Sequence, residues 1–253
     1  MKIAAQMYTV RKFCETQEDI FKSLKKIKEI GYSAVQLSAL GPIDTKILKA
    51  YIEDFELEVC ATHNSFQRFE ENLGDIIYEH KLLGCKYAGL GGMPGELRKK
   101  GIEGYQQFVE RAVVVANKLW EEGIHFIYHN HSFEFERFGD LNGWQYIIKN
   151  LPDSAQSEID TCWVQVGGGD PAEYIRSMSG RTDIVHFKDY FMDLNDERCL
   201  AEVGYGNLNW ASIFEACESA GVKYAAVEQD TCSGDPFESL RLSYEFLKKH
   251  GYK

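Results

Sequence analysis

The chain has 253 residues, of which 44% are hydrophobic, and carries a formal net charge of −11. This length suits one large domain, and the apolar content is sufficient for a sizeable core. Its acidic balance, with no run of Lys or Arg longer than three residues, argues against nucleic acid or an anionic membrane as a partner.

No apolar run approaches the roughly 20 residues that a membrane helix needs, and the first six residues resemble a strand rather than a signal peptide. The seven cysteines are scattered without a C-x-x-C pair. We interpret them as reduced thiols, most of them small core residues, and expect a cytoplasmic protein.

In the first half of the chain, short apolar runs alternate with longer amphipathic ones. Apolar residues at Ile20, Leu24 and Ile27 have helical spacing, and Gly31 ends that pattern. The same reasoning predicts strands at residues 3–8, 33–38, 57–62 and 87–90, and helices at residues 18–30, 44–55, 73–83 and 103–122.

The second half continues the alternation. Asp170 followed by Pro171 indicates a helix start, because Asp caps the first turn and Pro fits its first position. Strands are predicted at residues 124–128, 155–160, 183–188 and 224–228, and helices at residues 144–149, 171–178, 210–220 and 236–249.

Eight strand-then-helix units predict parallel strands with helical crossovers, and eight is the number that closes a barrel. We therefore predict one (β/α)8 TIM barrel domain over residues 1–253. An open doubly wound sheet is the alternative, but the first unit lacks the G-x-G-x-x-G turn of a dinucleotide-binding version.

Polar side chains stand where the predicted strands end, which is the working rim of such a barrel. Carboxylates crowded around one axis repel each other unless a cation neutralises them. A divalent metal with mixed oxygen and imidazole ligands resolves this, and such ligation suits Mn²⁺, Zn²⁺, Co²⁺ or Fe²⁺ better than Ca²⁺. These strand-end residues are Tyr8, Gln36, His63, the cluster from His129 to Glu134, Asp160, His186, Lys188 and Glu228.

Two of these residues have simpler interpretations that stay open. Asp160 could cap the turn that follows it, and His186 could be a core histidine with satisfied hydrogen bonds. Glu228 is harder to explain in this way, because an unpaired carboxylate is almost never fully buried.

Five segments in order resemble the sugar phosphate isomerase/epimerase superfamily, the xylose isomerase-like TIM barrels, over nearly the whole chain. These segments are Tyr128-His129-Asn130-His131 with Phe133-Glu134, Ile159-Asp160-Thr161 with Trp163 and the Gly167 to Pro171 turn, His186-Phe187-Lys188-Asp189, Val203-Gly204 with Gly206-Asn207, and Val227-Glu228.

The resemblance implies one divalent metal ion, Mn²⁺ first, with Zn²⁺, Co²⁺ or Mg²⁺ as alternatives. Three of the family's ligands correspond to Asp160, His186 and Glu228. The fourth is a carboxylate at the end of strand five, where this chain has Tyr128 and His129 instead. We expect Glu134, five residues beyond His129, to take that role, with His129 as the alternative.

By the same resemblance, the chain is expected to be a sugar or sugar phosphate isomerase or epimerase that moves a proton next to a metal-chelated carbonyl. Glu228 would serve one face of the substrate and His129 or His131 the other. Substrate contacts are expected from His63, Trp163 and Lys188.

Two other functions stay open: a metal-dependent lyase or dehydratase on a keto-sugar or keto-inositol, and a non-catalytic carbohydrate-binding barrel. The expected partner is a small carbohydrate, with no nucleic acid and no membrane. Relatives often form dimers or tetramers, so a homo-oligomer is also expected.

Overall fold

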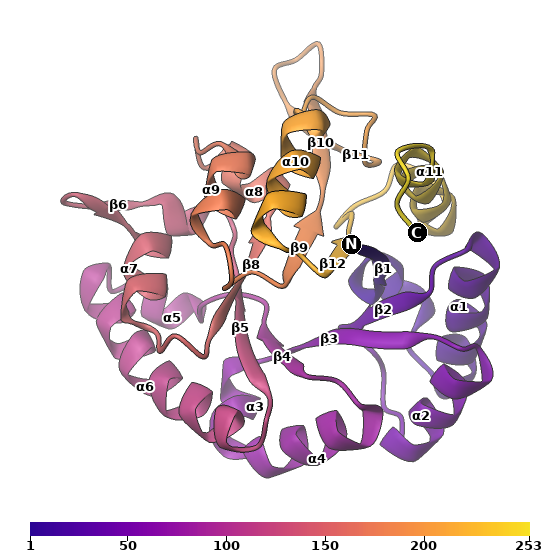
Figure 1. Cartoon of the computed structure of the whole chain (residues 1–253), viewed down its shortest axis with the longest axis horizontal. Helices are drawn as coiled ribbons and strands as arrows, with labels where there is room; N and C mark the ends of the chain where they lie inside the picture. The colour runs from indigo at the N-terminus through magenta and orange to yellow at the C-terminus, as the bar shows by residue number, and fades with distance from the viewer.

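The computed structural model describes all 253 residues and contains a closed barrel of eight parallel strands (Figure 1). Around the barrel the strands follow the order β1-β12-β9-β8-β5-β4-β3-β2, so neighbours in sequence are neighbours in space. The strands are β1 Lys2–Gln6, β2 Ala34–Leu37, β3 Glu58–Asn64, β4 Tyr87–Leu90, β5 His125–His129, β8 Gln156–Asp160, β9 Ile184–Phe187 and β12 Tyr224–Val227.

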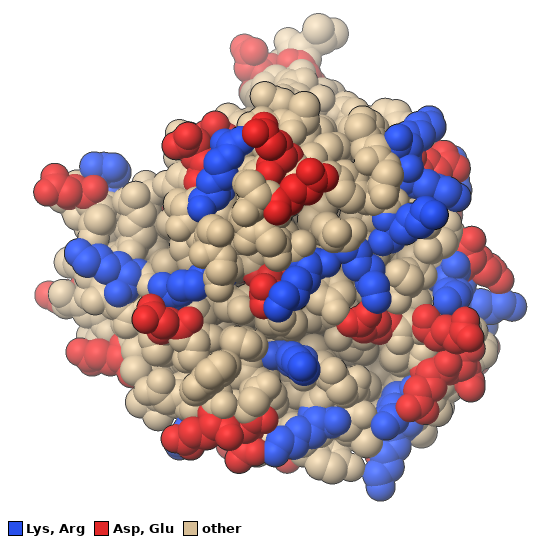
Figure 2. All heavy atoms as spheres, in the orientation of Figure 1, with Lys and Arg blue, Asp and Glu red and all other residues tan.

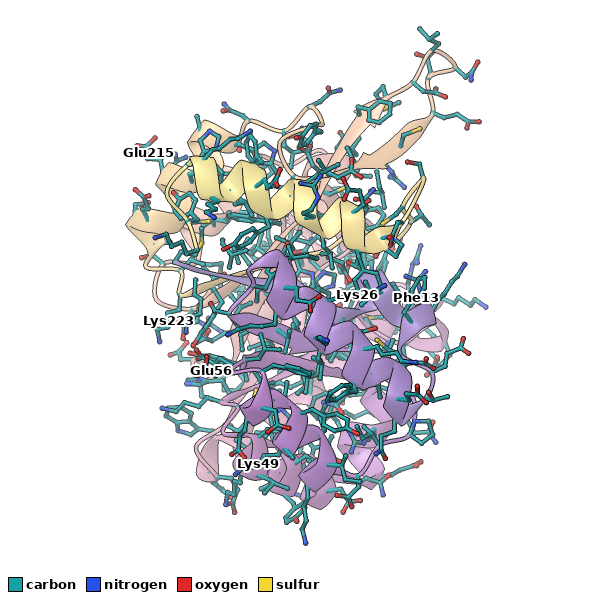
Figure 3. All side chains as sticks on the ribbon, turned by 90° about the vertical axis from the view of Figure 1, so that its right-hand side faces the viewer. Phe13, Lys26, Lys49, Glu56, Glu215 and Lys223 are labelled. Atoms are coloured by element: carbon teal, nitrogen blue, oxygen red, sulfur yellow. The ribbon has the colours of Figure 1, made fainter.

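Helices connect successive strands and surround the barrel, which confirms the predicted fold. The first and last of them lie side by side, where the ring closes (Figure 3). There the Phe13 and Phe237 rings are 5.3 Å apart, and Lys26 lies over Phe237. The principal helices are α1 Gln17–Ile30, α2 Thr45–Asp54, α4 Leu73–Leu83, α6 Ile102–Glu121, α7 Gly143–Asn150, α9 Pro171–Ser177, α10 Trp210–Ala220 and α11 Pro236–Lys249.

The first strand is shorter than predicted, because the chain winds into a 3-10 helix, η1 Met7–Phe13, directly after Gln6. Tyr8 therefore lies beyond the strand, and its backbone N–H donates to the Gln6 side chain. Several short elements in the loops were not predicted from the sequence. These are α3 Phe66–Glu71, α5 Gly95–Arg98, η2 Phe133–Phe135, α8 Thr161–Val166 and the hairpins β6 Arg137–Phe138 with β7 Leu141–Asn142 and β10 Asp189–Met192 with β11 Arg198–Ala201.

Successive residues of each strand point to opposite sides, so one set faces the barrel interior and the other faces the helices. Val185 and Phe187 of β9 belong to the large cluster shared with the helices, whereas Ile184 belongs to a separate small cluster. That small cluster includes Ala4, Ala34, Ala61 and Ala226, all of which are fully buried. Mainly apolar residues, several of them alanines, thus fill the barrel interior below the strand ends, and the polar residues of the candidate site lie towards those ends.

The loop between β11 and α10 is held by one buried carboxylate, Asp189. It accepts hydrogen bonds from the backbone N–H groups of Tyr190, Gly204, Gly206 and Leu208 and from the Trp210 indole, at 2.6–3.3 Å. A Cβ at Gly206 would lie 2.2 Å from an Asp189 oxygen, so this residue must be glycine. Glycine also suits the φ of +87° at Gly204.

Charged side chains of both signs are interspersed over the face shown in Figure 2. No helix is long and apolar enough to cross a membrane. All seven cysteines are free thiols, and five of them are buried.

Replacing Asp189 by Asn should lower the free energy of unfolding by about 2–3 kcal/mol, because an amide cannot accept from all five donors. Urea denaturation measures this. The control is Asp193→Asn, since Asp193 accepts from backbone N–H groups at the exposed hairpin turn and should be replaceable with little effect. Equal stability of the two variants would contradict this role of Asp189.

Candidate functional site

Four side chains that end neighbouring barrel strands converge on one point. The group contains two imidazoles and two carboxylates, and one ligand atom from each lies within 4.8 Å of the others. All four side chains are buried. The members are His129 at the end of β5, Asp160 at the end of β8, His186 in β9 and Glu228 directly after β12.

Hydrogen bonds orient both imidazoles with a nitrogen towards this group. His129 Nδ1 lies 3.2 Å from the Gly91 carbonyl oxygen, which can only accept, so Nδ1 carries the proton. His129 Nε2 is therefore the nitrogen left to bind a metal, and it lies 3.3 Å from Asp160 Oδ2. His186 Nδ1 lies 3.1 Å from Glu228 Oε2, and its Nε2 lies 2.9 Å from Gln36 Oε1.

The position of Asp160 is compatible with both roles considered for it. Its Oδ1 accepts from the Trp163 backbone N–H at 2.8 Å and caps α8. Its Oδ2 faces His129, and the Lys188 ammonium lies 3.1 Å from the same oxygen. Capping and ligation are therefore compatible, because each uses a different oxygen.

Glu134, the expected first ligand, is not a member of the group. Its Oε1 accepts from the Tyr128 hydroxyl at 2.6 Å, and its Oε2 accepts from the His131 backbone N–H at 2.8 Å. Burial raises the pKa of Glu134 to about 8, although the Tyr128 hydrogen bond opposes this shift. The carboxyl thus holds the loop that carries His131, while His129 stands among the four converging residues.

Lys188, expected to contact substrate, is buried among carboxylates. Its Nζ lies 2.6 Å from Glu228 Oε2 and 3.1 Å from both Asp160 Oδ2 and Asp230 Oδ2. Burial alone would lower the pKa of Lys188, but these three carboxylates outweigh it and raise the pKa well above its usual value. The ammonium is therefore a fixed positive charge at the centre of the site.

A polar cavity of about 420 Å³ opens onto the group. His63 and His131 line it, whereas Trp163 is not among its lining residues and lies beside His131, with ring centroids 5.8 Å apart. Buried His131 Nδ1, Trp163 Nε1 and Asn130 Nδ2 have no hydrogen-bond partner in the protein. The complete lining is Tyr8, Ser38, His63, Asn64, Ser65, Gly91, His129, His131, Glu228 and Asp230.

Two acidic residues of this region were missed from the sequence. Glu158 lies two residues before Asp160, and Asp230 lies two residues after Glu228. Since alternate strand residues share a face, spacing by two from a recognised strand-end carboxylate was the available signal for Glu158. Asp230 lies beyond β12, where that rule does not apply.

A sequence profile described as xylose isomerase-like TIM barrel matches residues 24–250. The chain belongs to this family.

Among solved structures, a sugar phosphate isomerase/epimerase from Parabacteroides distasonis matches with a TM-score of 0.81 and 21% identity, over 98% of this chain and 93% of that one. An L-ribulose 3-epimerase matches with a TM-score of 0.76 and 17% identity, over 98% and 94%. The probable 3-DHS dehydratase AsbF of Bacillus anthracis matches with a TM-score of 0.76 and 12% identity, over 98% and 99%. At these identities the likeness establishes the fold. No curated protein matches the chain.

The donor set of this xylose isomerase-like barrel fits one divalent ion. With both imidazoles neutral, Asp160, Glu228 and Asp230 carry three formal negative charges against the one positive charge of Lys188, a deficit that a divalent ion would fill. Burial opposes charge on His186, but Glu158 and Glu228 outweigh it and raise its pKa to about 10. The imidazole therefore holds a proton that a bound metal would displace.

Replacing Asp160 by Ala should abolish tight binding of Mn²⁺, since it removes one ligand and leaves the others around an open position. Isothermal titration of chelator-treated protein measures this, and wild type should bind one equivalent. Glu134→Gln is the matched control, because Glu134 is equally buried but outside the group. Retained affinity in Asp160→Ala, or its loss in Glu134→Gln, would contradict the assignment.

Proposed function

We propose that this chain is a metal-dependent sugar isomerase or epimerase that moves a proton next to a carbonyl. The observation that carries the proposal is the four-ligand group of His129, Asp160, His186 and Glu228, which opens onto a cavity with a polar lining. A non-catalytic carbohydrate-binding barrel would have no need for buried carboxylates converging at this rim.

The metal ion held by these residues, with Mn²⁺ favoured, would polarise the substrate carbonyl as a Lewis acid. In this assignment His129 rather than Glu134 is the fourth ligand. The support is the hydrogen bond of His129 Nδ1 to the Gly91 carbonyl, which leaves Nε2 directed at the group, and the full use of both Glu134 oxygens elsewhere.

Glu228 is the base in this proposal. Both His186 and Lys188 contact its Oε2, which leaves Oε1 free of these contacts and available to a substrate proton. His131 lines the same cavity, and burial together with His129 and Lys188 lowers its pKa to about 3. His131 is thus a neutral imidazole at neutral pH, suited to a hydrogen bond with a substrate oxygen.

The cavity lining favours an unphosphorylated substrate. It contains two carboxylates, Glu228 and Asp230, and no Lys or Arg. The nearby Arg68 is engaged by Asn64 and by Glu79. A phosphate group against this lining would therefore meet negative charge and no lining cation to bind it.

A lyase or dehydratase on a keto-sugar would begin with the same proton removal, so the assay must separate the two outcomes. Incubation of the Mn²⁺-loaded protein with ketohexoses in D₂O should place deuterium on a carbon next to the carbonyl without loss of water. Loss of water or of a substituent would favour the lyase. Loaded protein that exchanges no proton with any keto-sugar would contradict both enzyme proposals.

Replacing Glu228 by Gln should lower the exchange rate by roughly 10²–10⁴-fold, because the amide cannot accept the proton but can still offer an oxygen to the metal. Exchange is measured by mass spectrometry at saturating Mn²⁺, with metal occupancy determined on the same samples. Glu202→Gln is the control, since Glu202 bonds Ser239 and does not line the cavity. Wild-type exchange in a fully loaded Glu228→Gln variant would refute the role of Glu228.

The same assay tests the substrate class. A ketohexose should have a kcat/KM at least about tenfold higher than its monophosphate, owing to repulsion from Glu228 and Asp230. A clear preference for the phosphate ester would show that the cavity obtains a cation from elsewhere.

A further inference from the structure

We propose that Glu158 is a positioning residue that fixes the tautomers of two imidazoles, His186 beside the metal and His63 in the cavity wall. The part concerning His186 rests on the proposed metal site. The part concerning His63 stands on the protein alone.

Glu158 is fully buried inside the barrel and points to the same side of β8 as Asp160. Three donors surround its carboxylate. His63 Nε2 lies 2.5 Å from Oε2, Gln36 Nε2 lies 2.8 Å from Oε1, and His186 Nε2 lies 3.3 Å from Oε1. A buried carboxylate so fully surrounded by donors, and outside the metal group, has a role in orienting its neighbours.

The effect on His186 passes mainly through Gln36. Because a carboxylate only accepts, the Gln36 amide must turn its NH₂ towards Glu158 and its oxygen towards His186. His186 Nε2 must then keep its proton, so Nδ1, which faces Glu228 and the metal group, is the nitrogen that would give up its proton to a bound metal. Metal-binding histidines commonly donate their other N–H to a carboxylate. Here the Gln36 amide lies between His186 and the Glu158 carboxylate.

The effect on His63 is direct. Its Nε2–H donates to Glu158, so Nδ1 is left as a hydrogen-bond acceptor. Nδ1 lies on the side of Gly91, so close that a Cβ there would come within 3.3 Å of it, and both residues line the same cavity. His63 is therefore set to accept from a substrate hydroxyl, consistent with a polyol rather than a phosphate at this wall.

The trio His63, Glu158 and His186 could also be regarded as a second metal site, since their ligand atoms lie within 4.8 Å of one another. Against this, the trio and Gln36 already satisfy one another's hydrogen-bonding groups, and His63 is hydrogen-bonded directly to the Glu158 carboxylate. We therefore expect one equivalent of metal and not two.

The experiment uses ¹⁵N-histidine NMR and metal titration on wild type and Glu158→Gln. The chain has only seven histidines, and Zn²⁺ serves as a diamagnetic probe for the spectra, with Mn²⁺ for affinity. The matched control is Asp183→Asn. Asp183 also accepts from three side chains, Tyr87, Gln156 and Lys223 (labelled in Figure 3), but it precedes β9 at the opposite end of the barrel.

Wild type should show His63 protonated at Nε2 with or without metal, and His186 protonated at Nε2 when Zn²⁺ is bound. Glu158→Gln should bind Mn²⁺ roughly 10–100-fold more weakly and lose the single His63 tautomer, whereas Asp183→Asn should keep both. A His63 spectrum with the proton on Nδ1 in wild type, two equivalents of metal, or unchanged affinity in Glu158→Gln would each overturn the proposal.

Two results keep this inference distinct from the proposed function. A protein that binds metal and responds to Glu158→Gln, yet exchanges no substrate proton, supports the positioning role and refutes the enzyme. If Glu158→Gln does not fold, the wild-type His63 and His186 spectra decide the question alone.

Discussion

The structure depends on one electrostatic constraint, the convergence of buried carboxylates on the axis of the barrel. Asp160, Glu228 and Asp230 all lie within about 3 Å of the Lys188 ammonium, and Glu158 is buried one level below. Buried charges of one sign are tolerated only when they are paired or bind a metal. Lys188 supplies one positive charge. The imidazoles of His129 and His186 are placed to help bind a metal ion, which would supply the remaining positive charge.

Strand periodicity is what makes this arrangement possible. Residues that face the helices are large and apolar, such as Val185 and Phe187, and they stabilise the barrel from outside. Residues that face the axis are mainly apolar below the strand ends, with alanines such as Ala4 and Ala226 among them, and polar near the strand ends. The polar residues near the strand ends are therefore held by a rigid scaffold, which can keep the imidazoles in single orientations.

The barrel and three of the four converging residues could be predicted from the sequence. His186 and Glu228 end apolar runs typical of buried strands, whereas Asp160 follows a largely polar run and was indicated by its Ile159-Asp160-Thr161 motif, which resembles that of the family. The choice between His129 and Glu134 could not be predicted, since it depends on the Gly91 carbonyl and the Tyr128 hydroxyl, which come from distant or buried parts of the fold. Likewise, Lys188 had the residue type of a substrate contact, and only tertiary packing shows that three carboxylates surround it.

The most direct test of the account is anomalous diffraction from crystals soaked with Mn²⁺. We expect a single ion bound by His129 Nε2, Asp160, His186 Nδ1 and Glu228, with the Glu134 carboxyl still bonded to Tyr128 and the His131 backbone. An ion bound by Glu134 in place of His129, or no ion at this rim in a fully soaked crystal, would contradict it.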